Sequence, residues 1–142
     1  MFGYSHVDRE IGRVVSRLEQ LGLAENTVVA VWGDHGWQLG EHAEWSKHTN
    51  FEIAARVPLL VSVPGQAGGQ RVQQLVELVD LFPTLVAAAG FPALPTCPPD
   101  SPAPQLCSEG SSLLPLLQDP DIGWKEAAFW QYAKAGSGRD LG

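Results

Sequence analysis

The densest group of chemically active side chains in this 142-residue sequence lies between residues 33 and 51. Gly33-Asp34-His35-Gly36 sets a carboxylate beside an imidazole, and the flanking glycines let the backbone turn sharply enough for both to face one cation. Lys47 follows twelve residues after His35, and its ammonium could hold a tetrahedral anion as a point charge. These three side chains predict a site that binds a cation and an anion together.

Each of these signals is weak when it is taken alone. An Asp-His dipeptide is more often an exposed polar turn than a metal site, and a single lysine is more often a solvated surface charge. A tryptophan such as Trp37 is more often a packing residue than a ligand-binding one. We expect His42 to brace the loop through a hydrogen bond rather than to bind substrate, and Arg56 to be a structural ion-pair partner.

The expected neighbouring elements place this stretch at the edge of a sheet. Apolar residues spaced for one helical face predict a helix over residues 5–22. The β-branched run at 27–32 predicts a strand buried on both faces of a parallel sheet, and the run at 58–63 predicts a second strand. Because ligands of open α/β sheets bind at the carboxyl ends of the strands, the polar residues after position 32 are suitably located.

The rest of the chain predicts shorter elements on either side of a proline-rich stretch. We expect two domain parts, a sheet-and-helix part at 1–90 and a loop-rich part at 91–142. The expected elements are a strand at 75–79, a helix at 81–89 capped by Asp80, a short helix that begins at Ser111 or Ser112, and a final strand at 127–132.

Composition excludes several classes of partner. The net charge is −7 with nine Lys and Arg together, which argues against nucleic acid as a partner. No apolar run approaches the roughly 18–20 residues that a membrane span needs. The first residues have neither a basic nor an apolar region of the kind found in secretory signals, so we expect no signal peptide in this chain itself.

Two cysteines bound the proline-rich stretch. Cys97 and Cys107 are separated by nine residues, of which four are proline. This spacing is compatible with a disulfide and thus with an oxidising compartment, and two free thiols are the alternative.

The order of residue types over about forty positions resembles the type I sulfatase family of the alkaline phosphatase superfamily. The segment ENTVVAVWGDHGWQLGEHAEWSKHTNFEIAARVPLLVSVPG carries most of the likeness, and LVELVDLFPTLVAAAG extends it. Within the family, the pattern of Trp37, His42 and Trp45, the Asn50-Phe51 pair and the cysteine loop most resemble iduronate-2-sulfatases. The resemblance implies a carboxyl-side piece of a sulfatase, with a partial α/β sandwich of alkaline-phosphatase type and a mainly parallel sheet flanked by helices.

The resemblance also implies a role for each site residue. Asp34 and His35 match two ligands of a divalent cation, normally Ca²⁺. Lys47 matches the catalytic lysine that contacts the sulfate of the substrate, and Trp37 would contribute to substrate binding. Gly33 departs from the serine that the family usually has before Asp-His. Cys97 and Cys107 would form a disulfide made on the secretory route.

One essential part of the sulfatase pattern is missing from this sequence. The family's nucleophile lies in Cys-x-Pro-Ser-x-Arg, whereas Cys97 lies in CPPDSPAP and Cys107 in CSEGSS. The resemblance implies a longer parent protein in which this chain is joined to an amino-terminal part that carries the nucleophile. That protein would remove 2-O-sulfate from iduronate in dermatan and heparan sulfate, in the lysosome. We expect this chain alone to be inactive.

Two alternatives come from other classes of protein. The first is a phosphatase or phosphodiesterase of the same superfamily, which would favour two zinc ions, although no second Asp-His cluster follows Phe51. The second is a non-catalytic remnant of a sulfatase with a structural or binding role.

Overall fold

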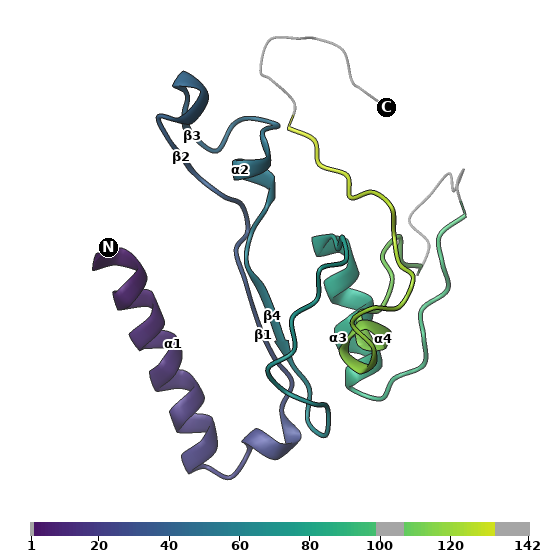
Figure 1. Cartoon of the computed structure of the whole chain (residues 1–142). Helices are drawn as coiled ribbons and strands as arrows, with labels where there is room; N and C mark the ends of the chain where they lie inside the picture. The colour runs from purple at the N-terminus through teal and green to yellow at the C-terminus, as the bar shows by residue number, and fades with distance from the viewer. Residues whose placement is uncertain (1, 99–106, 133–142) are drawn as a thin grey trace.

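The computed structural model describes residues 2–98 and 107–132, and Figure 1 shows their arrangement. A long amino-terminal helix stands beside a two-stranded ribbon, a small hairpin continues one end of that ribbon, and two helices lie together in the carboxyl-terminal half. In chain order the elements are α1 (Phe2–Gln20), η1 (Ala24–Asn26), β1 (Val29–Trp32), β2 (Gln38–Leu39), η2 (Glu41–Ala43), β3 (Trp45–Ser46), α2 (Glu52–Ala55), β4 (Leu59–Ser62), η3 (Leu78–Asp80), α3 (Leu81–Ala88) and α4 (Leu114–Gln118).

Strand β1 matches the strand predicted at 27–32, and β4 matches the one predicted at 58–63. The two strands pair with each other in antiparallel orientation. Their register runs from Val29 opposite Ser62 to Trp32 opposite Leu59. A parallel pair needs a crossover of a dozen or more residues, usually a helix packed on the sheet. The chain between them instead forms the β2–β3 hairpin and the four-residue helix α2, and then returns. The expected parallel pairing is therefore wrong for the strands in the described part of the chain.

The apolar core of the described residues lies where η3, α3 and α4 meet. Leu81, Leu113 and Leu116 are buried there. Thr84 joins the elements, because its hydroxyl donates to the Asp80 carbonyl at 2.6 Å and accepts from the Leu113 amide at 2.8 Å. One buried hydroxyl therefore connects the start of α3 to the start of α4.

Asp80 is fully buried and ties three segments of the chain together. Its carboxylate accepts the Glu77 amide at 2.9 Å and the Ser111 amide at 2.8 Å. The Lys125 ammonium donates to both of its oxygens, at 2.6 and 2.8 Å. Lys125 also donates to the Glu77 carboxylate at 2.8 Å. We call Glu77, Asp80 and Lys125 the Asp80 cluster. Asp80 does not cap α3 through its side chain as predicted, since that side chain is used in this cluster.

The charges of the Asp80 cluster stabilise one another. The hydrogen bond from Lys125, together with one from the Phe129 amide, holds the pKa of Glu77 below its ordinary value. Burial opposes the charge on Lys125, but hydrogen bonds to Asp80 and Glu77 outweigh it and raise the pKa of Lys125. Glu77 and Lys125 are therefore both charged at neutral pH.

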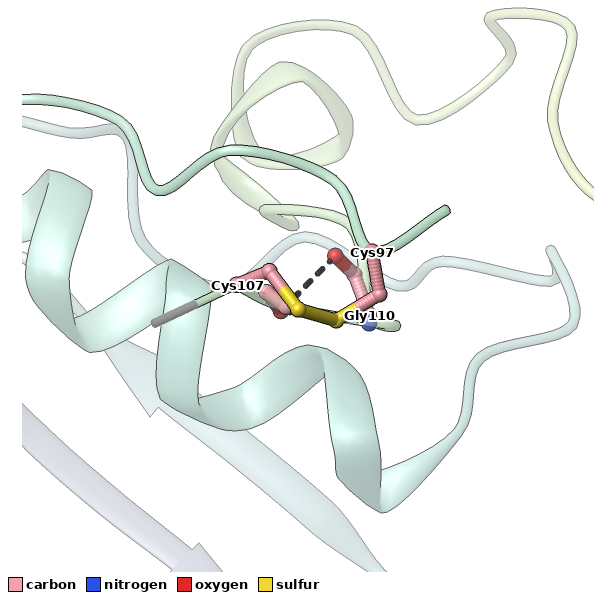
Figure 2. Close-up of a disulfide and its surroundings, with 4 residues drawn as sticks. Cys97, Cys107 and Gly110 are labelled. Carbon is pink, nitrogen blue, oxygen red and sulfur yellow. Dashed lines mark hydrogen bonds between the residues drawn. A yellow bond between two sulfur atoms is a disulfide. The ribbon is translucent and has the colours of Figure 1, made fainter. Parts of the chain in front are cut away.

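Cys97 and Cys107 form a disulfide, as predicted, with their Cα atoms 4.9 Å apart (Figure 2). The chain segments on either side of it are joined by backbone bonds, because the Cys97 amide donates to the Ser108 carbonyl and the Ser108 amide to that of Pro95. Gly110, also drawn in Figure 2, lies so close to the backbone of η3 that an added Cβ would stand 2.1 Å from the Val79 carbonyl oxygen. The disulfide thus anchors the chain that leads into α4.

Helix α1 confirms the predicted amphipathic helix and begins three residues earlier, at Phe2. Several of its large apolar side chains remain exposed, as do others along the molecule; on α1 they are Tyr4, Val7 and Val14. None of the helices in the described residues is long and apolar enough to cross a membrane.

Two predicted strands are absent from the described residues. The segments at 75–79 and 127–132 are apolar and rich in strand-forming residues, but neither has a neighbouring strand to pair with. Their backbone groups bond to side chains instead: the Glu77 amide to Asp80, the Phe129 amide to Glu77, and the Tyr132 amide to Asn50. Residues 78 and 79 belong to η3 instead, and the rest of these two segments forms no regular secondary structure despite its strand propensity.

Replacing Lys125 tests the importance of the Asp80 cluster. Lys125→Met keeps most of the side-chain volume but leaves the carboxylate of Asp80 buried without its cation, which is expected to cost about 3–5 kcal/mol of unfolding free energy. Urea denaturation gives this value. The matched control is Arg56→Ala, which breaks the exposed Arg56–Glu52 pair and is expected to cost about 0–1 kcal/mol. Equal losses in the two variants would contradict the assignment.

The direction of the pKa shifts sets the pH dependence of stability. The contribution of Glu77 is fully present above its ordinary pKa of 4.5 and is lost as pH falls through the lowered value in the fold. The contribution of Lys125 is fully present below 10.5 and is lost as pH rises through its raised value. We expect the urea midpoint of Glu77→Gln to fall less than that of the unaltered chain between about pH 5 and pH 3. Identical acid slopes would argue against this origin.

Candidate functional site

The loop after β1 is fixed by close backbone contacts with the chain around α2. The Gly33 amide donates to the Pro58 carbonyl at 3.1 Å, and the Gly36 amide to that of Ala54 at 2.8 Å. Gly36 has no room for a side chain, because an added Cβ would lie 1.8 Å from the Ile53 carbonyl oxygen. These contacts set the positions of the two residues between the glycines, Asp34 and His35.

The structure brings the side chains of Asp34, His35 and Lys47 together. Asp34 Oδ2 lies 3.2 Å from His35 Nε2, and Lys47 Nζ lies 2.6 Å from the same nitrogen. Asp34 Oδ1 also accepts the His35 amide at 3.1 Å. A carboxylate, an imidazole and an ammonium therefore meet at one point just beyond the end of β1, as the sequence predicts.

The contacts of His35 favour one tautomer. With the hydrogen on Nδ1, the ring donates to the Gly36 carbonyl oxygen at 2.9 Å and leaves Nε2 to accept from Lys47, although Asp34 Oδ2 also lies 3.2 Å from Nε2. In the neutral ring, Nε2 then presents its lone pair, and Lys47 can donate to it. A carbonyl partner on the far nitrogen is the usual arrangement for a histidine that binds a metal ion.

The donor set fits a divalent cation in part. Asp34 Oδ2 and His35 Nε2 are 3.2 Å apart, so one ion at the about 2.3–2.6 Å typical of calcium could contact both. The Asp34 side chain is 82% exposed and His35 is 23% exposed, which leaves the carboxylate open to further ligands. No group of three or more His, Cys, Asp or Glu side chains converges within residues 2–98 and 107–132. Asp34 and His35 are thus two candidate donors, fewer than the six to eight oxygen ligands of a complete calcium site.

The hairpin that carries Lys47 holds three residues other than glycine in the left-handed region. His42, Ala43 and Ser46 have φ values of 58°, 56° and 81°. Such residues cost roughly 1–3 kcal/mol each and persist where their surroundings hold them. The His42 ring stacks on Phe51 with ring centroids 4.0 Å apart, so it braces the loop, though by stacking rather than by the hydrogen bond we expected.

The other predicted residues lie around the site rather than in it. Trp37 is 52% exposed, and its ring centroid is 6.4 Å from that of His35. Arg56 forms an exposed ion pair with Glu52, as predicted. His48, for which the sequence predicts no role, stacks on Tyr132 with ring centroids 4.9 Å apart.

Sequence reasoning missed the residues that hold this loop. Gln38 is fully buried and donates to the Thr49 hydroxyl at 3.2 Å. The indole of Trp130 donates to the Thr49 carbonyl at 3.2 Å, and Asn50 bonds the backbone of Tyr132. A glutamine between two large apolar residues, Trp-Gln-Leu, was the available signal for Gln38. No local pattern links residues 130–132 to the loop.

Residues 3–91 match the family model described as Sulfatase. The chain belongs to the sulfatase family. Iduronate 2-sulfatase of Mus musculus is 43% identical to it over 143 residues, which cover 83% of this chain and 26% of that protein. The human iduronate 2-sulfatase is 42% identical over the same shares. Arylsulfatase K of Canis lupus familiaris is 36% identical over 122 residues, covering 86% of this chain and 20% of that protein.

Two solved structures are similar in fold as well as in sequence. BT4656, in complex with its substrate D-glucosamine-2-N,6-O-disulfate, has a TM-score of 0.75 and 30% identity over 92% of this chain and 25% of that one. A phosphonate monoester hydrolase from Silicibacter pomeroyi has a TM-score of 0.68 and 33% identity over 79% of this chain and 20% of that one. These similarities confirm the predicted α/β class of alkaline-phosphatase type. The chain spans about a quarter of the length of the iduronate 2-sulfatases it matches.

Ser46 offers a test of the strain in the loop that leads to Lys47. Ser46→Gly removes the penalty of a left-handed φ and is expected to raise the unfolding free energy by about 1 kcal/mol. The matched control is Ser62→Gly in β4, where glycine should lower it by about 0.5–1 kcal/mol. Chemical denaturation of both variants measures the difference, and a loss of stability in Ser46→Gly would count against strain at this position.

Proposed function

We propose that this chain supplies the cation-binding and sulfate-binding side of a sulfatase active site within a longer protein that hydrolyses sulfate esters. The observation that carries the proposal is the convergence of Asp34, His35 and Lys47, in a chain of this family. If the side chains of these three residues pointed away from one another, the proposal would have no support.

Lys47 would hold the sulfate group. Its ammonium has three donors. The donor directed to His35 Nε2 would be released when a cation takes the lone pair of that nitrogen, so all three would be available to oxygens of a tetrahedral anion. A fixed positive charge at this position favours the negative charge that develops on the bridging oxygen when the ester bond breaks. Because Lys47 is half-buried, this attraction is less screened than at an exposed site.

Asp34 and His35 would hold a divalent cation, for which Ca²⁺ is our proposal. When bound, such an ion would polarise a sulfate oxygen. Asp34 contributes a hard oxygen donor, and the Gly36 carbonyl orients the His35 ring by accepting from Nδ1. The nucleophile and the remaining cation ligands would come from an amino-terminal part of the same protein.

The identity to iduronate 2-sulfatases supports a narrower proposal about the substrate. We infer that the longer protein removes 2-O-sulfate from iduronate in dermatan or heparan sulfate, in the lysosome. Trp37, exposed beside His35, would then contact the sugar ring. The disulfide between Cys97 and Cys107 is consistent with passage through the secretory route.

A second candidate is hydrolysis of phosphate or phosphonate esters, which the similarity to a phosphonate monoester hydrolase favours. Phosphate and sulfate are both tetrahedral anions that one ammonium and one cation can hold. Assays with matched aryl sulfate and aryl phosphate esters separate the two candidates, because the ester that turns over faster identifies the class.

Activity measurements test the main proposal. In the protein that joins this chain to a segment with Cys-x-Pro-Ser-x-Arg, Lys47→Ala should lower kcat for a chromogenic aryl sulfate by roughly 10²–10³-fold, because one donor to the developing charge is lost. Arg17→Ala, which removes an exposed positive charge from α1, is the control and should leave kcat unchanged.

The 142-residue chain alone should show no turnover of the same substrate in the presence of calcium. Turnover by this chain that Lys47→Ala abolishes would contradict the proposed need for a second part. An unchanged kcat for Lys47→Ala in the longer protein would contradict the role of Lys47.

A further inference from the structure

Gln38 is a fully buried polar residue that contacts the loop on both sides of Lys47. Its backbone pairs in register with Ser46, the residue just before Lys47. Its side-chain amide donates to the hydroxyl of Thr49, two residues after Lys47, at 3.2 Å. Gln38 is therefore attached to the chain immediately before and shortly after the ammonium-bearing residue.

Both attachments act on positions that control the direction of Lys47. Ser46 has a φ of 81°, a conformation that needs support from its surroundings, and its partner across the hairpin is Gln38. The Thr49 amide donates to the Lys47 carbonyl at 2.8 Å, so a fixed Thr49 also fixes the peptide unit of Lys47. The path from Gln38 to Lys47 is thus short on each side.

Burial of Gln38 is unfavourable in itself. The residue has 0% exposure, and its Oε1 has no hydrogen-bond partner among the described residues. A buried acceptor without a partner destabilises a fold, whereas an apolar side chain of similar volume would fill the same space without that penalty. Departures of this kind from the most stable sequence are typical of functional sites.

We propose that Gln38 is a positioning residue, which places the ammonium of Lys47 beside Nε2 of His35. The role of Lys47 in anion binding rests on the proposed function, but the placement of Lys47 by Gln38 does not. The carboxyl-terminal segment holds the same loop from its other side, through Trp130 and Tyr132, yet those contacts reach only Thr49 and the residues on either side of it, His48 and Asn50. Gln38 is the contact that spans Lys47.

The test replaces Gln38 with methionine in the full 142-residue chain. Gln38→Met keeps the volume and removes the amide. We expect hydrogen exchange at the Thr49 amide to accelerate roughly 2- to 10-fold, corresponding to one net hydrogen bond. The NMR signals of Lys47 should shift, and the apparent Kd for inorganic sulfate should rise by a similar factor. The urea midpoint should stay equal or rise, which a merely stabilising residue would not allow.

Gln74→Met is the matched control, since it removes an amide that donates to the Ile122 carbonyl at 3.1 Å away from this loop. It should leave the Thr49 exchange rate, the Lys47 signals and the sulfate affinity unchanged. Thr49→Val removes the hydroxyl that accepts from Gln38, so it should reproduce the effects of Gln38→Met. If Gln38→Met does not fold, Thr49→Val tests the positioning role in its place.

The outcomes separate this inference from the proposed function. Unchanged Lys47 signals and Thr49 exchange in folded Gln38→Met, or in Thr49→Val, would overturn the positioning role. If the unaltered chain binds no inorganic sulfate while Gln38→Met still frees Thr49, the positioning role stands and anion binding by Lys47 is wrong for this chain.

Discussion

The buried carboxylate of Asp80 is the constraint on which most of the described structure depends. A charge with no exposure to water is tolerated only with opposite charge and hydrogen-bond donors around it. Here the donors come from Glu77, Ser111 and Lys125, which lie in three separate segments of the chain. The need to satisfy one carboxylate therefore brings together the start of α3, the chain before α4 and the carboxyl-terminal segment, around a core with few buried leucines.

The same constraint extends to the candidate site. Beyond Lys125 the chain is bonded to Glu77 through the Phe129 amide and then reaches the loop after Lys47, where Trp130 and Tyr132 bond to Thr49 and Asn50. The loop is thus held between a distant segment on one side and Gln38 on the other. The contacts that hold the left-handed residues of the hairpin in place are therefore the same contacts that, on our proposal, direct the Lys47 side chain.

The sequence was sufficient where short-range patterns decide the structure. The helical spacing of α1, the β-branched run of β1 and the Pro-Gly stop after β4 are local signals, and the Asp-His pair with Lys47 was recognised through its fixed spacing within the family pattern. The segments at 75–79 and 127–132 could not be predicted, since their conformation depends on whether another strand edge is available. The roles of Gln38 and Asp80 were missed for a related reason: a single polar residue in an apolar stretch shows neither its depth nor its partner until the chain is folded.

The bond between Cys97 and Cys107 has a further consequence for the covalent integrity of the molecule. A peptide bond cut anywhere between these two residues would not release the carboxyl-terminal portion, because the sulfur bridge would still join it to the remainder. The bridge would therefore keep the carboxyl-terminal elements at high effective concentration beside α3, Asp80 and the loop after Lys47. These elements are α4, Lys125 and the segment that supports Thr49. A chain of this design could be cut between the two cysteines and still keep the candidate site and its supporting segments together.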